Sequence, residues 1–171
     1  MKLLILRHAK SSWSNPALDD KERPLNARGK RDALRMGQFL RDQGLQPDMV
    51  IASNATRVEA TIQRLLKAMD HRPADLIWRD CLYGTEPENW LSTLVHFPVA
   101  QQKVLICGHN PELESLANLL CRVPPAIPED GKLIPTATLV ELSFDGPWRK
   151  LTPNICELVR ITRPKSLSPL T

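Results

Sequence analysis

The chain has 171 residues, which is enough for one domain with a sizeable core and short for two. Its charged fraction of 25% is ordinary for a globular protein, and a mild net charge of +4 with scattered basic residues argues against nucleic-acid binding. No apolar stretch approaches the roughly 20 residues needed to span a bilayer, so no membrane partner is expected.

Strands and helices are predicted to alternate from the start of the chain. The aliphatic run 2–7 is typical of a buried strand, and a polar loop follows it. Asn26 is the expected cap of a helix that continues to about Gln43, where Gly44 ends it. The buried face of this helix is predicted to contain Ala33, Met36, Gly37 and Leu40.

The next segments continue the alternation. DMVIAS, residues 48–53, predicts a second buried strand, and ADLIW, residues 74–78, predicts a weaker third one. A helical stripe lies between them, formed by Val58, Ile62, Leu65 and Met69. A third helix is expected in TEPENWLSTLVHF, residues 85–97, with a capping box that joins Thr85 to Glu88.

KVLICGHN, residues 103–110, predicts a fourth strand. Asn110-Pro111 is the expected start of a fourth helix, because asparagine caps helices and proline suits the first turn. Its buried stripe is predicted to contain Leu113, Leu116, Ala117 and Leu120. After a proline-rich loop from Arg122 to Pro135, the segment ATLVELSFDGPWRKL is expected to form a hairpin around an Asp-Gly turn.

Strands interleaved with helices predict a mostly parallel sheet that is covered on both faces. We therefore expect a single three-layer α/β/α sandwich with an antiparallel edge hairpin. The domain is assigned to residues 1–162, and residues 163–171 are predicted to form a loose C-terminal tail.

Two features bear on the cellular compartment. The apolar start of the chain is interrupted by a charged pair too early for a secretory signal, which favours a cytoplasmic protein. The cysteines show no C-x-x-C pairing and are expected to be buried, inert thiols in a reducing compartment. They are Cys81, Cys107, Cys121 and Cys156.

Polar residues follow three of the predicted strands. Because the carboxyl ends of parallel strands lie along one edge of a sheet, these residues are expected to meet in one crevice. Arginine forks and helix N-termini bind phosphate oxygens, so the crevice fits a compact, multiply charged anion. The residues are Arg7, His8, Ser53, Arg57, His109 and Asn110.

His8 can do more than bind an anion. An imidazole is nucleophilic at neutral pH when one ring nitrogen is unprotonated and the other is held by a hydrogen bond. At a rigid strand end among arginines, His8 can attack phosphorus in line while the guanidinium groups stabilise the equatorial oxygens. Two guanidinium groups supply the positive charge, so neither a metal nor another cofactor is expected.

The chain resembles the histidine phosphatase superfamily, the phosphoglycerate-mutase-like fold, and in particular its small SixA-type phosphohistidine phosphatases. The resemblance runs in order from Met1 to about Thr152 and rests on the combination of an R-H pair, S-x-x-x-R-x-x-x-T and a late G-H. The segments that carry it are LRHAKSSW, RPLNARG, SNATRVEAT, CGHNPEL and PTATLVEL.

The resemblance implies that His8 is the phosphorylated nucleophile, that Arg7 and Arg57 clamp phosphate oxygens, and that His109 completes the pocket. The backbone N–H of Asn110 is a further expected donor, and Ser53 either touches phosphate or caps the following helix. The family motif has glycine after the nucleophile, where this chain has Ala9. Alanine is tolerable there if the backbone does not require positive φ.

Hydrolysis of a phosphate ester usually needs a general acid, because an alkoxide is a poor leaving group. The candidates are Glu86, Glu88, Asp19 and Asp20. Glu88 has a competing assignment in the capping box, and the aspartates lie in a charge run that is typical of a solvated loop. Without an acid, a phosphoramidate is the better substrate, since imidazole leaves without strong proton donation.

The sequence therefore favours a metal-independent phosphatase acting on protein phosphohistidine. Two alternatives remain open: a general acid phosphatase acting on small phosphate esters, and a catalytically weak module that only binds phosphate. The expected partner is a phosphohistidine-bearing protein or a small phosphorylated substrate. An intact His8 favours the enzymes over the binding module, because a binder needs only the arginines.

Overall fold

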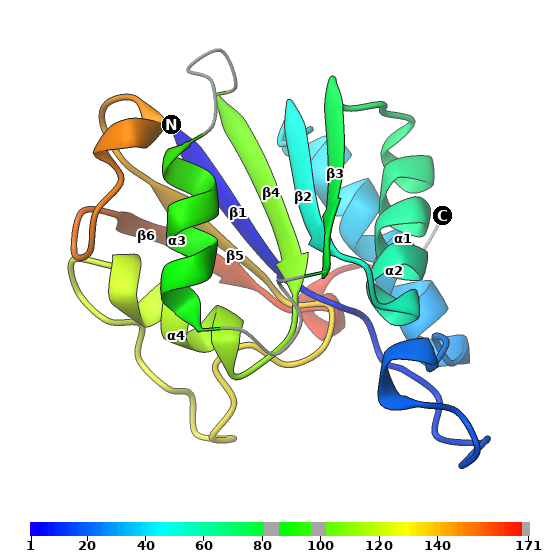
Figure 1. The fold of residues 1–171 in the computed structure, drawn as a ribbon. Coiled ribbons are helices and arrows are strands. Elements are labelled where there is room, and N and C mark those ends of the chain that lie inside the picture. Colours follow the sequence, from blue (N-terminus) through cyan, green and yellow to red (C-terminus); the bar gives the residue numbers. More distant parts are fainter. Residues whose placement is uncertain (81–85, 97–101, 169–171) are drawn as a thin grey trace.

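A six-stranded sheet forms the centre of the molecule (Figure 1). The computed structural model describes residues 1–80, 86–96 and 102–168. The strand order is β3-β2-β4-β1-β5-β6, and β5 is antiparallel to both of its neighbours while the remaining neighbours are parallel. The strands are β1 (Lys2–Arg7), β2 (Met49–Ser53), β3 (Asp75–Arg79), β4 (Lys103–Gly108), β5 (Leu139–Ser143) and β6 (Glu157–Thr162).

The α-helices of the described residues cover both faces of this sheet, α1 and α2 on one side and α3 and α4 on the other (Figure 1). This arrangement confirms the predicted three-layer sandwich with a mostly parallel sheet. None of these helices has both the length and the apolar character needed to cross a membrane. The helices are α1 (Ala27–Asp42), α2 (Thr56–Met69), α3 (Pro87–Val95) and α4 (Glu112–Leu120).

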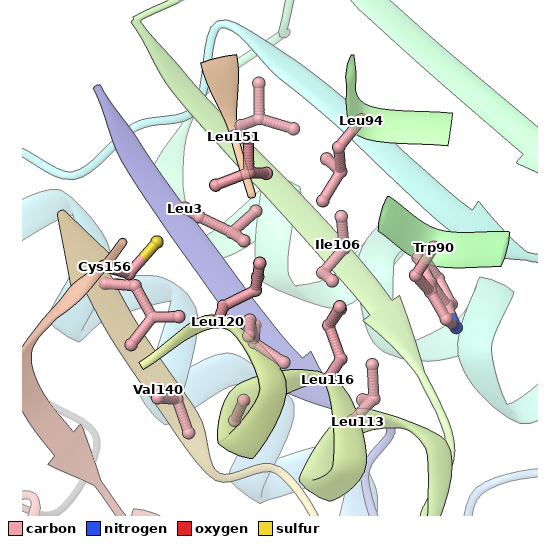
Figure 2. Close-up of a cluster of buried hydrophobic side chains, with 14 of the residues drawn as sticks. Leu3, Trp90, Leu94, Ile106, Leu113, Leu116, Leu120, Val140, Leu151 and Cys156 are labelled. Atoms are coloured by element: carbon pink, nitrogen blue, oxygen red, sulfur yellow. The ribbon is translucent and has the colours of Figure 1, made fainter. Parts of the chain in front are cut away.

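The alternation of side chains along β1 explains how one strand serves two cores. Leu3 and Ile5 belong to the cluster under α3 and α4, and Leu4 and Leu6 belong to the cluster under α1 and α2. Figure 2 shows the first cluster, where Leu3 lies among side chains of β4, α3 and α4. Each fully buried leucine contributes roughly 1.5–3 kcal/mol. The strand is therefore packed on both faces from Leu3 to Leu6, immediately before the site residues.

The start of α1 is specified by two residues of the sequence. Asn26 is the N-cap, and its side chain accepts a hydrogen bond from the N–H of Gly29 at 2.8 Å, as predicted. A Cβ at Gly29 would lie 2.2 Å from the main-chain oxygen of Lys10, so only glycine fits there. The first turn of α1 therefore packs directly against the loop that follows β1.

The predicted buried stripes of the first, second and fourth helices are confirmed, but two helix starts differ from the predictions. Helix α3 begins at Pro87 with Glu86 as its N-cap, so the capping box from Thr85 was wrong as the start of the helix, and Thr85 itself lies outside the described residues. Helix α4 has Pro111 rather than Asn110 as its N-cap. The Asn110 side chain is instead engaged by Glu114 and by the main chain of Ile134.

The predicted hairpin is correct only in its first strand. β5 pairs with β6, and residues Trp148–Lys150 form a 3-10 turn instead of a strand. Trp148 is fully buried and packs edge-on against Phe144, with ring centroids 5.2 Å apart, so core packing overrides the strand pattern. Strand β6 was not predicted, because its first three residues are exposed and show no alternating pattern.

Candidate active site

Three strand ends place their polar residues together at the carboxyl edge of the sheet. His8 follows β1, Arg57 lies in the first turn of α2 after β2, and His109 follows β4. Arg57 Nε lies 3.3 Å from His8 Nε2, and Arg57 Nη2 lies 3.3 Å from His109 Nδ1. The two imidazole rings are 5.0 Å apart between centroids. The three side chains therefore lie together at one edge of the sheet, as expected.

The hydrogen bonds of His8 define its protonation state. Its Nδ1 lies 2.8 Å from the main-chain oxygen of Ala9, and because a carbonyl only accepts, Nδ1 carries the proton and donates it. Nε2 then keeps its lone pair and accepts from Arg57. The side chain is buried on a rigid strand end, so this tautomer and orientation are held in place.

Burial and nearby positive charge keep both histidines neutral. Burial is the main cause that lowers the pKa of His8 to about 4, and the guanidinium groups of Arg57 and Arg7 act in the same direction. Burial, followed by the neighbouring His8 and Arg57, lowers the pKa of His109 to about 3. At neutral pH both imidazoles are therefore unprotonated at one nitrogen.

Thr61 connects the loop after His8 to the first turn of α2. Its hydroxyl accepts a hydrogen bond from the N–H of Ala9 at 3.0 Å and donates to the main-chain oxygen of Arg57 at 2.6 Å. These hydrogen bonds give a structural role to the threonine at the end of the S-x-x-x-R-x-x-x-T pattern, for which the sequence alone indicated none. Ala9 is not among the residues with positive φ, so alanine meets the backbone requirement at this position.

Ser53 is fully buried and lies next to His109. Its Oγ is 3.2 Å from His109 Nε2, and because Arg57 donates to Nδ1, Nε2 carries the proton and donates it to Ser53. The N-cap of α2 is Ala55, so Ser53 does not fill the capping role that was the alternative. Ser53 thereby fixes the tautomer of His109.

Arg7 and Asn110 meet at the main chain of Ile134. Both donate to the main-chain oxygen of Ile134, Arg7 Nη1 at 2.8 Å and Asn110 Nδ2 at 3.0 Å. Asn110 Nδ2 also donates to Glu114, and the carboxylates of Glu114 and Glu112 act electrostatically on Arg7. The Nε of Arg7 is buried without a hydrogen-bond partner in the structure, so a donor of this guanidinium is unused.

The charge run DDKER contributes two side chains to the site. The Asp20 carboxylate accepts from Arg57 Nη2 at 2.8 Å through Oδ2 and from Arg23 Nη1 at 2.9 Å through Oδ1. The main-chain oxygen of Asp20 also accepts from Arg57. The interpretation of this run as a solvated loop therefore fails for Arg23, which is buried, whereas Asp20 is exposed but is bonded to Arg57. The hydrophobic periodicity of the sequence gives no indication of a contact between this loop and Arg57.

The other carboxylates considered as acids lie at exposed positions. Asp19 is exposed at the start of the short 3-10 helix η1 (Asp20–Glu22), and Glu86 and Glu88 are exposed at the start of α3. Their role as proton donors stays a prediction. Within residues 1–80, 86–96 and 102–168, no three His, Cys, Asp or Glu side chains gather in a way that would hold a metal ion.

Comparisons with known proteins agree with this geometry. The profile of the histidine phosphatase superfamily (branch 1) matches residues 3–82. An uncharacterised chloroplastic protein of Arabidopsis thaliana is 29% identical over 127 residues, which is 70% of this chain. The chain spans 58% of the length of that relative.

Solved structures match over nearly the whole chain. A candidate phosphohistidine phosphatase SixA from Nakamurella multipartitia is 27% identical, with a TM-score of 0.80 over 99% of this chain and 96% of that chain. The protein histidine phosphatase SixA in complex with tungstate has the same fold, with 20% identity and a TM-score of 0.80 over 96% of this chain and 98% of that chain. Profile, fold and the strand-end residues agree in their likeness to the histidine phosphatase superfamily.

Proposed function

We propose that the protein is a metal-independent phosphatase in which His8 is the nucleophile and protein phosphohistidine is the substrate. One observation carries the proposal: His8 Nδ1 donates to the main-chain oxygen of Ala9, which leaves the Nε2 lone pair facing Arg57. A neutral, oriented imidazole beside a guanidinium is the arrangement that attack on a bound phosphoryl group requires.

In the first step, His8 Nε2 forms a bond to phosphorus while the bond from phosphorus to the substrate nitrogen breaks. The substrate imidazole leaves with that electron pair and takes a proton from solvent. In the second step, water attacks phosphorus, the bond to His8 Nε2 breaks, and inorganic phosphate is released with neutral His8 restored. Nδ1 of His8 keeps its proton and its hydrogen bond to the main-chain oxygen of Ala9 throughout, so the ring does not rotate away between the steps.

The remaining site residues bind and orient the phosphoryl group. Arg57 lies against both imidazoles, and its positive charge stabilises the equatorial oxygens as negative charge builds up on them. Arg7, with its unused Nε, supplies a second guanidinium. His109, held by Ser53, completes the pocket, and the backbone N–H of Asn110 is a further donor. Two guanidinium groups provide the charge that a metal supplies in other phosphatases.

A phosphoramidate is the preferred substrate because its leaving group needs little protonation. The carboxylate that reaches the arginines, Asp20, accepts from two guanidinium groups, and such bonds favour its ionised form. The structural relative with 27% identity is named as a candidate phosphohistidine phosphatase, which supports the same substrate class.

The direct test follows inorganic phosphate released from a phosphohistidine-bearing protein in the presence of EDTA. The wild type should release phosphate, and His8→Ala should not. His96→Ala, which removes an exposed histidine, is the matched control and should behave as the wild type. Release at equal rates by the wild type and His8→Ala would contradict the mechanism, and loss of activity with EDTA would contradict metal independence.

A second candidate, a phosphatase acting on small phosphate esters, is favoured by the position of Asp20 beside Arg57, where a protonated carboxylic acid would reach a leaving oxygen. Rates on a phosphoramidate and on an alkyl phosphate at neutral pH separate the two. A much larger kcat/KM for the phosphoramidate supports the first proposal, and the reverse order supports the second.

A further inference from the structure

Two buried arginines share one carboxylate at the mouth of the site. Asp20 Oδ2 accepts from Arg57 at 2.8 Å, and Asp20 Oδ1 accepts from Arg23 at 2.9 Å. Each carboxylate oxygen therefore accepts a hydrogen bond from a different guanidinium group. A phosphoryl group carries its oxygens at a similar spacing and prefers the same donors. The carboxylate marks a position where an anion is held between Arg57 and Arg23.

We propose that Arg23 is a third guanidinium of the phosphate site and that Asp20 is an internal competitor which the phosphoryl group displaces. The inference rests on the proposed function, because it assumes that Arg57 binds the phosphoryl group. It assigns a binding role to Arg23, the first arginine of the RPLNARG segment, and a role in tuning affinity to the carboxylate three residues before it.

Arg23 is held in place by groups other than Asp20. Its Nε donates to the main-chain oxygen of Ser12 at 3.1 Å, and its Nη2 lies 3.4 Å from Ser11 Oγ. Its guanidinium carbon lies 3.0 Å above the centroid of the Trp13 ring. When Asp20 moves away, Arg23 therefore keeps its position, and the donor that served Asp20 becomes available to an anion.

The loop that carries Asp20 is fixed at its base and exposed at its tip. Ser11 and Leu25 form a bridge, and the N–H of Ser12 donates to the main-chain oxygen of Pro24 at 2.7 Å. At the tip, the Asp20 side chain is 53% exposed, and the neighbouring Lys21 is joined to Asp80 by an exposed ion pair of a kind that contributes little stability. The main-chain oxygen of Asp20 stays bonded to Arg57, but its half-exposed side chain can turn away while the base keeps Arg23 in place.

Asp20 is better suited to compete with the substrate than to donate a proton. Each of its oxygens accepts a charge-assisted hydrogen bond, which favours the ionised form, whereas a general acid must be protonated before it acts. Phosphate is larger and carries more charge than a carboxylate, so it can also reach His8 and the other donors of the site. Substrate binding should therefore replace Asp20 on both arginines.

The first experiment measures tungstate binding by isothermal titration calorimetry with the wild type, Asp20→Asn and Asp19→Asn. Asp20→Asn should bind tungstate roughly tenfold more tightly or better, since a competing charged acceptor is removed. Asp19→Asn removes the same charge from the exposed adjacent residue and should stay within about twofold of the wild type. Equal or weaker binding by Asp20→Asn than by Asp19→Asn would overturn the competitor role.

The second experiment tests Arg23 in the Asp20→Asn background, so that no carboxylate is left unpaired. Adding Arg23→Gln should weaken tungstate binding roughly ten- to a hundredfold. Arg31→Gln, at an exposed position of α1, is the matched control in the same background. Thermal melting of each variant checks folding, and Arg23→Lys, which keeps the charge without the fork, should restore only part of the affinity. Unchanged affinity in a folded Arg23→Gln variant would overturn the proposed contact.

Kinetics separates this inference from the proposed function. If Asp20→Asn lowers kcat on an alkyl phosphate while tungstate binding is unchanged, Asp20 is a proton donor and the competitor role is overturned. If the wild type binds tungstate and requires His8 for phosphate release, but Asp20→Asn and Asp19→Asn behave alike, only the further inference fails. A wild type that binds no tungstate overturns both.

Discussion

Two clusters of the molecule each place one carboxylate between two cations, and they are built in opposite ways. Glu141 on β5 is paired with Lys2 at 2.6 Å and with Arg160 at 2.8 Å. Its side chain is 1% exposed, while the two cations reach the surface at 44% and 35%. Around Asp20 the carboxylate is 53% exposed, and the two arginines are almost fully buried.

The difference shows which charge in each cluster requires a partner. A buried charge must be paired, whereas an exposed one can be hydrated. In the Glu141 cluster the buried charge is negative and its two cations belong to fixed strands, so the cluster is complete without any ligand. In the Asp20 cluster the buried charges are positive, and the anion comes from a loop tip. Such a cluster can exchange its own carboxylate for an external anion.

The strongest test of this difference replaces one arginine by lysine in each cluster. Arg57→Lys should lower kcat/KM for phosphoramidate hydrolysis roughly a hundred- to a thousandfold, because an ammonium group cannot reproduce the guanidinium fork. Arg160→Lys should leave kcat/KM within about twofold of the wild type. Steady-state kinetics with thermal melting of both variants gives the answer, and equal losses of activity would show that the two clusters are not functionally distinct.

The pH dependence of the free energy of unfolding tests the buried histidines of the site. The pKa of His8 is lowered to about 4 and that of His109 to about 3, against about 6.5 in the unfolded chain. Below pH 6.5 these histidines therefore bind protons in the unfolded chain but stay neutral in the folded one. Because the unfolded chain binds more protons, the free energy of unfolding falls as pH falls from 6.5 to 4. The loss should be about 3 kcal/mol for His8 alone.

Urea denaturation at pH 7, 6, 5 and 4 measures this loss in the wild type, His109→Asn and His96→Asn. His109→Asn should flatten the pH dependence of the free energy of unfolding between pH 6.5 and 4. His96→Asn, at an exposed position, should keep the slope of the wild type. Identical slopes in all three proteins would contradict the burial of neutral histidines in the site.

The Glu141 cluster should respond in stability and not in activity. Glu141→Gln removes the negative charge and turns an amide NH2 group toward one of the two cations, Lys2 or Arg160, so it should lower the free energy of unfolding by roughly 1–3 kcal/mol. Glu157→Gln, which removes an exposed carboxylate paired with Arg122, should change it by less than about 0.5 kcal/mol. Urea denaturation measures both, and a loss of kcat/KM in Glu141→Gln would assign this cluster a functional role.

The smallest expected effect concerns Ala9, the residue after the proposed nucleophile. Ala9 is fully buried and does not have positive φ, so glycine brings no conformational benefit there. Ala9→Gly should lower the free energy of unfolding by roughly 0.5–1 kcal/mol through chain entropy and leave kcat within about twofold. Chemical denaturation and steady-state kinetics test this. A tenfold rise in kcat would mean that alanine restrains the nucleophile.

Most of the sheet and the central side chains of the site could be predicted because they depend on simple patterns. Buried strands are marked by aliphatic runs, and parallel strands bring their carboxyl ends to one edge whatever lies between them. That rule predicts that His8, Arg57 and His109 meet, and the structure shows their contacts. The caps of α3 and α4 were missed because proline and a neighbouring carboxylate competed with the local signal.

The sequence by itself determined the parallel core, the alternation of helices and the meeting of two imidazoles with Arg57, because periodicity and chain topology are properties of the order of residues. Only the tertiary structure decided that Asp20 joins Arg23 to Arg57, that Ser53 holds His109, and that β6 rather than the Trp148 segment pairs with β5. These contacts join residues far apart in the chain that lie in loops, at strand ends or on exposed edges. Their energies depend on burial and distance in three dimensions, which no local pattern encodes.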